Sequence, residues 1–459
     1  MIRYGKSRWR SVVSAAGQWR GDEPLRTRLV NIAHLMSGNL ASGLISLAAI
    51  ALTARALGPA SYGILALAIA YVRVVERLVT FQSWQPLIKY GAEVTDPEHA
   101  ADFKSLLKFG LLLDVAGAVA AWVIATALAL LASPLFGWDN QVMTLVAIYC
   151  TVLLFNISGT PTAILRLYGR YHAAAYGPIG NALLRVGLCY LGIRNGAGLD
   201  YFVFVWMATQ ILGSLTFLGF GIRALRANGI RGVLAAPIKG VTQRFHGLWS
   251  FAWQSNLSLT LRSSAQQLDT LLVGALADPA SAGFYHIAKQ VGRMAQQIGV
   301  HVQAVLYPDV ARLWAAGAIQ EFRRAILQVE VMLAAFGIAV VLLLLAAAKP
   351  ILLYTAGPAF LGAAPLMIVQ GIAVAAMLLS FPARSALLAM GHQRQVLNVA
   401  MVSTVAFHCA ALALIPLIGA MGANIAHILL GFVWLVMLGT LLRRELSHAP
   451  LAGAPTPSV

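Results

Sequence analysis

The sequence has few charged residues, few acidic residues and only three cysteines. Asp, Glu, Lys and Arg together make up 11% of its 459 residues, whereas a typical soluble domain has about a quarter. Apolar residues make up 59% of the chain, and the mean hydropathy is +0.76. Because so much apolar surface cannot all be buried inside a soluble core, the composition predicts an all-α integral membrane protein.

The motifs that usually carry catalysis or bind metal are also absent. Cys150, Cys189 and Cys409 lie in separate apolar stretches, and the sequence has no CxxC motif and no His/Cys cluster. It has no DxD motif, and we identify no nucleophilic triad and no phosphate-cradling loop. We therefore expect no enzymatic activity, no bound metal and no cofactor. A membrane glycan polymerase or ligase, which would need catalytic residues on a long external loop, is the distant alternative.

Long apolar stretches are abundant and predict about twelve transmembrane helices. The predicted spans are 30–55, 61–87, 105–132, 141–161, 177–194, 201–224, 246–276, 280–306, 326–347, 361–389, 396–416 and 419–442. Most of the 33 Lys and Arg residues lie in one alternate set of loops, whereas the opposite loops hold only Arg194 and Lys349. The positive-inside rule therefore places both termini in the cytoplasm. The same distribution explains the net charge of +17, because basic loops on the cytoplasmic side contact anionic membrane lipid. The charge therefore does not predict nucleic-acid binding.

Two short stretches indicate an internal repeat. An offset of 220 aligns Pro59–Gly63 with Pro279–Gly283, and it also aligns Arg73 with Arg293. A chance match is the alternative, since Pro and Ser commonly begin helices. The repeat predicts two parallel six-helix lobes around a central cationic cavity. The predicted segments are a basic N-tail at 1–29, an N-lobe at 30–224, a linker at 225–245, a C-lobe at 246–443 and a C-tail at 444–459.

Polar stripes mark the first two helices of each predicted half. A charged residue at mid-bilayer costs about 2.5–3.5 kcal/mol, so such residues usually face a cavity or a partner. The predicted cavity cations are Arg73, Arg77, Arg262, Lys289 and Arg293. The polar residues predicted beside them are Glu76, Gln266, Asp269, His286 and Gln297. This excess of cations suits an anion that carries phosphate; the alternative is that the charges pair and lock helices together.

Two acidic residues are candidates for coupling transport to a proton or Na⁺ gradient. Asp114 lies in the third predicted span, and Glu330 lies near the start of the ninth. Either carboxylate could equally lie near the membrane surface and reach the interface.

Several stretches of the sequence are similar to one family of transporters. They resemble the Wzx-like oligosaccharide flippases, which are polysaccharide transporters of the multidrug/oligosaccharidyl-lipid/polysaccharide exporter superfamily. The resemblance covers roughly residues 30–440 and is carried by Thr53–Ala68, Leu268–Leu276, Pro279–Tyr285 and Pro350–Pro365.

The resemblance implies a V-shaped transporter of the bacterial cytoplasmic membrane that opens alternately to its two sides. It implies a substrate of the undecaprenyl-diphosphate-linked oligosaccharide type, a repeat unit of O-antigen, capsule or exopolysaccharide, moved to the outer leaflet. It also implies that cavity cations attract the diphosphate and acidic sugars, a role that would fall to Arg73, Arg262, Lys289 and Arg293. Membrane lipid and a glycan polymerase or chain-length machinery are the implied partners.

Two relatives within the superfamily remain as alternatives. Lipid II flippases usually have two further helices, which are not found in this sequence. A multidrug exporter of cations would need an acidic cavity, whereas the predicted cavity is cationic.

Overall fold

The computed structural model describes residues 23–81, 83–94, 96–132, 140–254, 256 and 268–448. Within these ranges the chain forms helices and turns and no strand, which confirms the predicted all-α fold. The first half contains α2 (Glu23–Val79), α3 (Trp84–Gly91), η1 (Pro97–His99), α4 (Ala100–Ala132), α5 (Asn140–Cys150), η3 (Thr151–Phe155), α6 (Gly159–Leu167), α7 (Tyr171–Arg194), α8 (Leu199–Ala227), η4 (Val233–Ala235) and α9 (Val241–Arg244). The second half contains α11 (Asp269–Leu276), α12 (Pro279–Ala315), α13 (Ile319–Thr355), η5 (Pro358–Ala363), α14 (Ala364–Ala389), α15 (Gln393–Ile418) and α16 (Ala420–His448).

The first predicted span and most of the second form one bent element, α2. Its kink lies at Gly58, whose φ of 70° is in the left-handed region that glycine adopts without a steric penalty. Pro59 follows and has no backbone N–H to continue the helical hydrogen bonds. The second predicted span was expected to reach residue 87, but α2 ends at Val79 and the short helix α3 follows after a break.

The fourth predicted span is interrupted as well. α5 passes into η3, and α6 begins only at Gly159 after residues 156–158, which belong to no helix. Neither this interruption nor the break after Val79 was predicted.

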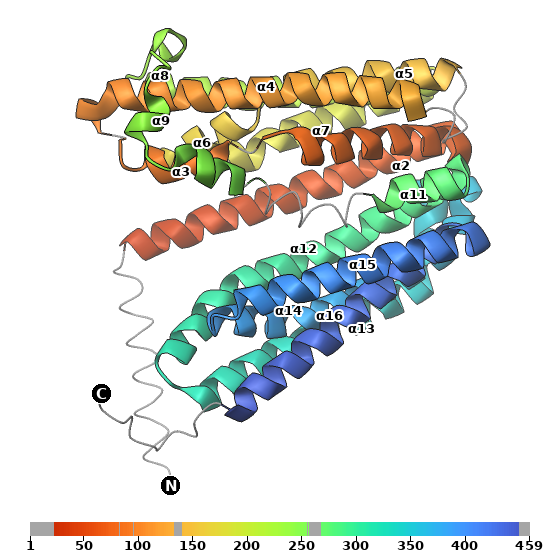
Figure 1. Cartoon of the computed structure of the whole chain (residues 1–459). Coiled ribbons are helices and arrows are strands. Elements are labelled where there is room, and N and C mark those ends of the chain that lie inside the picture. The colour runs from red at the N-terminus through yellow and green to blue at the C-terminus, as the bar shows by residue number, and fades with distance from the viewer. Residues whose placement is uncertain are drawn as a thin grey trace.

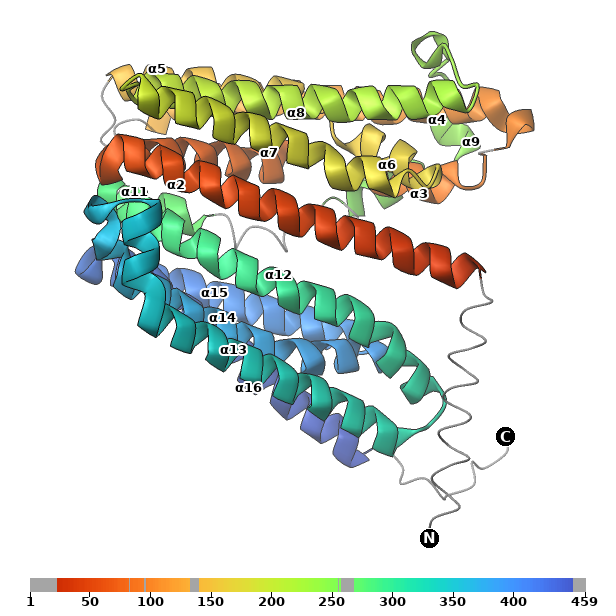
Figure 2. The same cartoon turned by 180° about the vertical axis from the view of Figure 1, so that it is seen from behind.

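The helices form two groups, with α2 and α12 facing each other between them (Figures 1 and 2). These two helices converge near α11 and diverge toward their other ends. At the convergent end one hydrophobic core contains residues of both groups, such as Tyr62 from α2 and Tyr285 from α12. At the divergent end the groups have separate cores, one around Phe103 and another around Phe322. The exact boundaries of two six-helix lobes and their linker stay a prediction.

The segment that begins the seventh predicted span packs against the first group of helices. Phe245 and Leu248 share a core with Leu87 and Tyr90 of α3. The hydroxyl of Tyr90 also donates a 3.0 Å hydrogen bond to the carbonyl of His246. Residues 241–251 are therefore held by the first half of the chain at the divergent end.

Eight stretches of the described residues are long and apolar enough to cross a membrane. α7 and α12, with 24 and 37 residues, are not among them. In the middle of α12, Lys289, Arg293 and their polar neighbours lower the hydropathy of a helix that is long enough to span. The stretches support an integral membrane protein, but they do not confirm the predicted number of twelve spans.

Candidate functional site

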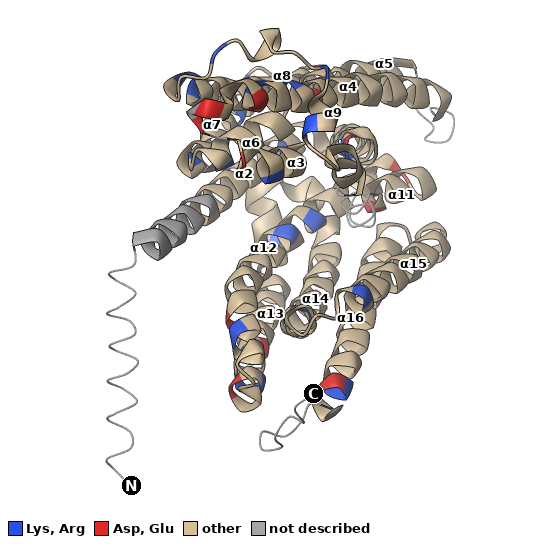
Figure 3. Ribbon diagram, turned by 60° about the vertical axis from the view of Figure 1, so that its left-hand side comes forward, with Lys and Arg blue, Asp and Glu red and all other residues tan. Residues whose placement is uncertain are grey.

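The repeat-related arginines lie in the same region between the two groups of helices. Arg73 of α2 interacts electrostatically with Lys289 and Arg293 of α12, and also with His286. Figure 3 shows basic positions within α12, between the two groups. Neither Arg73 nor Arg293 forms an ion pair with any carboxylate of the described residues. Two guanidinium groups from opposite halves therefore remain available to an anion.

Lys289 is different, because its charge is paired. Its ammonium group forms an ion pair with Asp269, and the two side chains are 7% and 0% exposed. The other carboxylate oxygen of Asp269 accepts hydrogen bonds from Tyr285, at 2.8 Å, and from His427, at 2.9 Å. The backbone N–H of Thr270 donates to Asp269 at 2.7 Å. This network joins α11, α12 and α16, so here the geometry favours the alternative in which charges lock helices together.

A groove of about 420 Å³ lies beside Arg293, between α12 and the first part of α2. The wall formed by α2 includes the apolar residues Leu40, Leu47 and Ile50. The wall formed by α12 is mostly polar and includes Arg293 and Gln297, together with Gln290 and His301. Such a groove fits a ligand that has one polar, anionic part and one apolar part.

The convergent end is closed by contacts between the two halves. The hydroxyl of Tyr62 in α2 lies 2.7 Å from Nδ1 of His286 in α12, and both side chains are buried. The ring of Tyr62 also packs edge-on against Phe360. Arg55 donates to the carbonyl of Tyr354 at 3.3 Å. The predicted cavity residue His286 therefore contributes to closure.

The remaining predicted site residues are less closely connected with this cluster. Arg77 lies near the end of α2 and is exposed, whereas Glu76 is partly buried and acts electrostatically on Tyr149 together with Arg73. Glu330 is partly buried on α13. Arg262 and Gln266 lie outside the described residues, so their predicted role stays a prediction.

The residues predicted for the site do not include Arg185, a cation inside the first group of helices. Arg185, well inside α7, donates through Nε to Thr209 at 2.8 Å, and its guanidinium lies 4.4 Å from the ring centroid of Trp206. Both Arg185 and Arg73 act electrostatically on Tyr149. A basic residue in the middle of an apolar span was the available signal, since such a residue is costly unless a cavity or partner compensates it.

More than half of the chain, residues 29–314, matches the family model described as "Polysaccharide biosynthesis protein". The chain belongs to this polysaccharide biosynthesis family. Among curated proteins it is 28% identical to the inner membrane protein YghQ of Escherichia coli (strain K12) over 295 residues. That alignment covers 64% of this chain and 83% of YghQ.

Two solved transporter structures share the fold of this polysaccharide biosynthesis protein. The lipid II flippase MurJ, in an inward closed conformation, superposes with a TM-score of 0.67 and 13% identity over 89% of this chain and 87% of MurJ. An inward-facing multidrug resistance MATE family transporter of the MOP superfamily superposes with a TM-score of 0.63 and 15% identity over 91% of this chain and 94% of that chain. At these identities the similarity is one of fold, and it agrees with the superfamily indicated by the sequence.

One predicted coupling residue of this polysaccharide biosynthesis protein occupies a structural position. Asp114 of α4 is 4% exposed, and its carboxylate accepts hydrogen bonds from Ser83, at 2.6 Å, and from the backbone N–H of Thr160, at 2.7 Å. Thr160 lies in the first turn of α6, and Ser83 lies in the break before α3. The buried carboxylate thereby satisfies polar groups at both chain interruptions, which would otherwise be costly inside a membrane.

Replacing Asp114 by Ala is expected to reduce the free energy of unfolding by about 1–3 kcal/mol, because buried donors on Ser83 and Thr160 lose their acceptor. Thermal unfolding of the purified protein in detergent measures the effect. Asp309→Ala is the control, since the ion pair of Asp309 with Arg312 is exposed and should contribute at most about 1 kcal/mol. Equal losses in the two variants would contradict the capping role of Asp114.

Proposed function

We propose that this protein is a flippase that moves an undecaprenyl-diphosphate-linked oligosaccharide from the cytoplasmic to the outer leaflet. The observation that carries the proposal is the pair Arg73 and Arg293, which have no ionic partner among the described carboxylates. Arg293 also lines an amphipathic groove. Guanidinium groups match the oxygens of a diphosphate in charge and geometry. The membership in a polysaccharide biosynthesis family supports a glycan-linked lipid as substrate.

In this mechanism the protein shelters the polar head while the lipid tail stays in an apolar environment. The diphosphate and sugars would enter between the two helix groups and offset the charges of Arg73 and Arg293. The polyprenyl tail would lie along the apolar residues Leu40, Leu47 and Ile50 of the groove, or in the bilayer beside it. Sheltering removes the main barrier to crossing, because a bare polar head is very costly to transfer into hydrocarbon.

The orientation follows from the distribution of charge in the loops. With the termini in the cytoplasm, as the positive-inside rule predicts, the divergent ends of α2 and α12 face the cytoplasm and the convergent end faces outward. The structure would then represent a state open to the cytoplasm, ready to receive substrate from the inner leaflet. The relative YghQ supports placement in the inner membrane. A rocking motion of the two groups would open the convergent end.

A multidrug exporter is the second candidate, favoured by the similarity to the MATE family transporter. The central cluster argues against it, since Arg73, Lys289 and Arg293 outnumber the carboxylate of Asp269 and would repel a cationic drug. The fold similarity to MurJ equally allows lipid II as the substrate. Interaction with a glycan polymerase or chain-length machinery is a further expectation of the glycan flippase proposal.

Reconstitution tests the function directly. Purified protein in liposomes should move a fluorescent polyprenyl-diphosphate oligosaccharide to the opposite leaflet, which can be measured by quenching with an impermeant reductant. Empty liposomes give the background rate. Transport of cationic drugs without transport of the lipid-linked sugar would overturn the proposal in favour of the multidrug exporter.

Arg293→Ala should lower the flipping rate about tenfold or more, because charge-assisted hydrogen bonds to phosphate contribute roughly 1.5–3 kcal/mol. The matched control is Arg312→Ala on the same helix, where the exposed Arg312 pairs with Asp309. Both variants should insert and purify like the parent protein. Wild-type flipping by Arg293→Ala would remove this residue from the substrate site.

A further inference from the structure

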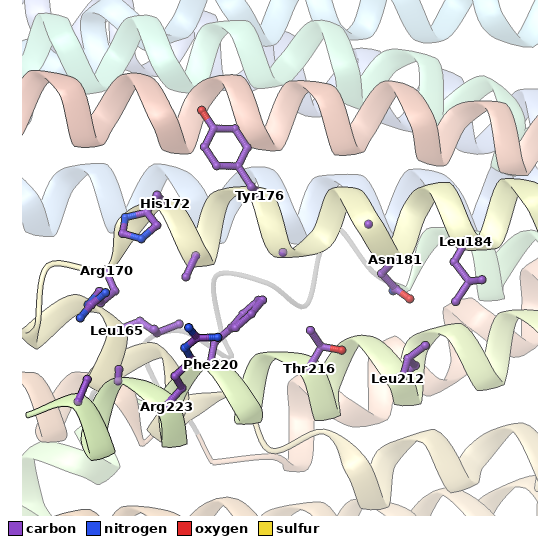
Figure 4. Close-up of a pocket in the computed structure, with 15 residues that line it drawn as sticks. Leu165, Arg170, His172, Tyr176, Asn181, Leu184, Leu212, Thr216, Phe220 and Arg223 are labelled. Carbon is purple, nitrogen blue, oxygen red and sulfur yellow. The ribbon is translucent and has the colours of Figure 1, made fainter. Parts of the chain in front are cut away.

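A second and larger cavity lies within the first group of helices. It has a volume of about 840 Å³ and is formed by α7, α8 and the end of α6 (Figure 4). None of its lining residues belongs to the groove beside Arg293. Both walls are partly exposed, for example at Leu184 of α7 and Leu212 of α8. The cavity is therefore accessible from outside the helix group and separate from the groove beside Arg293.

The basic groups of this cavity are gathered at one end. Arg170 and His172 lie at the start of α7, and Arg223 lies near the end of α8. Figure 4 shows Arg170 and Arg223 at the same end of the cavity, with Phe220 next to Arg223. Neither arginine forms an ion pair with a carboxylate of the described part of the chain. An anionic group is the chemical complement of this end.

The free N–H groups of a helix start add to the attraction for an anion. α7 begins beside Arg170, and no side chain caps its first turn. The N-terminus of a helix carries a partial positive charge and donors that bind phosphate well. Arg170, Arg223 and this helix start together therefore fit a phosphate group.

Beyond the basic end, the lining is mainly apolar and elongated. It continues along α7 to Leu184 and is interrupted by the polar residues Asn181 and Thr216. From Arg170 to Leu184 the helix covers about 20 Å, at 1.5 Å per residue. That length is comparable with half the thickness of the hydrocarbon core, about 15 Å. A lipid with its phosphate at Arg170 could thus lay an acyl chain between α7 and α8.

We propose that the cavity between α7 and α8 binds one anionic phospholipid, with its phosphate held by Arg170 and Arg223. The excess of positive charge selects an anionic lipid over a zwitterionic one, whose headgroup has no net charge. Because Arg170 and Arg223 lie on the predicted cytoplasmic side, the lipid comes from the cytoplasmic leaflet. This inference goes beyond the flippase function and does not depend on it.

A glycine in the cavity wall gives a clean way to test occupancy. A Cβ added at Gly180 would meet no neighbouring atom within 4 Å, so Gly180→Leu can place apolar volume in the cavity. Leu also favours the helix more than Gly does, which protects folding. Gly187→Leu is the matched control, since Gly187 lies on the same helix, is equally open and does not line the cavity.

The experiment uses the full-length protein in detergent with phosphatidylglycerol or phosphatidylcholine added. Native mass spectrometry should show phosphatidylglycerol bound to the wild type and to Gly187→Leu, with phosphatidylcholine binding at least tenfold weaker. Gly180→Leu should lose the bound lipid. The double variant Arg170→Ala/Arg223→Ala should lose the preference for phosphatidylglycerol. This double variant and Gly180→Leu should both stay folded.

Three results would overturn the proposal. One is equal binding of the two phospholipids to the wild type, and another is full phosphatidylglycerol binding by Gly180→Leu. In the third, the wild type binds a polyprenyl phosphate but not phosphatidylglycerol, and Gly180→Leu blocks this binding. The cavity would then bind the transported lipid. Flipping in liposomes is a separate measurement, so failure here leaves the flippase proposal standing.

Discussion

Replacing Asp269 by Ala should reduce the free energy of unfolding by about 3–5 kcal/mol and abolish transport. The substitution leaves the ammonium of Lys289 buried without its partner, and unpaired buried charges are among the most destabilising changes known. Tyr285, His427 and the N–H of Thr270 lose their acceptor at the same time. Folded yield and thermal unfolding in detergent measure the loss, and Asp309→Ala serves again as the exposed control.

A double variant separates the structural role of this pair from its role in transport. Asp269→Leu with Lys289→Met removes both charges, and apolar residues of similar volume often replace a buried ion pair at little cost in stability. We expect this variant to fold much better than Asp269→Ala and to regain transport, because removing the ammonium and the carboxylate together leaves the net charge beside Arg73 and Arg293 unchanged. Poor transport by a folded double variant would show that the pair also takes part in transport. Wild-type transport by the double variant would mean that the Lys289–Asp269 pair only holds α11, α12 and α16 together.

Long apolar runs made the uninterrupted helices easy to predict. The predicted span 201–224 corresponds to α8 (Leu199–Ala227), and 396–416 corresponds to α15 (Gln393–Ile418). Each is a continuous run whose pattern does not depend on the rest of the fold. The breaks before α3 and α6 could not be predicted in this way, because the carboxylate that satisfies them belongs to Asp114 on a different helix.

The candidate site could be predicted from the sequence only where the internal repeat paired its residues. The offset of 220 aligned Arg73 with Arg293, and in the structure these arginines interact electrostatically across the two halves. The pairing of Lys289 with Asp269 and His427 was not predicted. Helical angles group residues within one helix, whereas this network joins three helices whose mutual rotation only the tertiary packing determines.

Gly63→Ala should keep the convergent end from closing and reduce flipping at least tenfold. A Cβ at Gly63 would lie 1.7 Å from the carbonyl oxygen of Pro279 and 2.5 Å from its carbonyl carbon. The contact is reciprocal, since a Cβ at the repeat-related Gly283 would lie 2.7 Å from the carbonyl oxygen of Pro59. These are backbone atoms at two helix starts, so no side-chain rotation can relieve the overlap.

The expected consequence is a shift of population toward the state open at this end, while each group of helices keeps its own core. A cysteine at the fully buried Ala282, in a background without the exposed Cys409, reports on closure. Labelling by an impermeant maleimide should be slow in the parent and fast with Gly63→Ala.

Gly439→Ala adds the same methyl group where no atom lies within 4 Å, and it should change neither labelling nor flipping. A transporter must adopt both its open and its closed states. Faster labelling together with a loss of flipping would therefore show that this glycine contact closes the convergent end during the transport cycle. Unchanged labelling and flipping in Gly63→Ala would instead mean that the two helix starts can separate at no cost to the transport cycle.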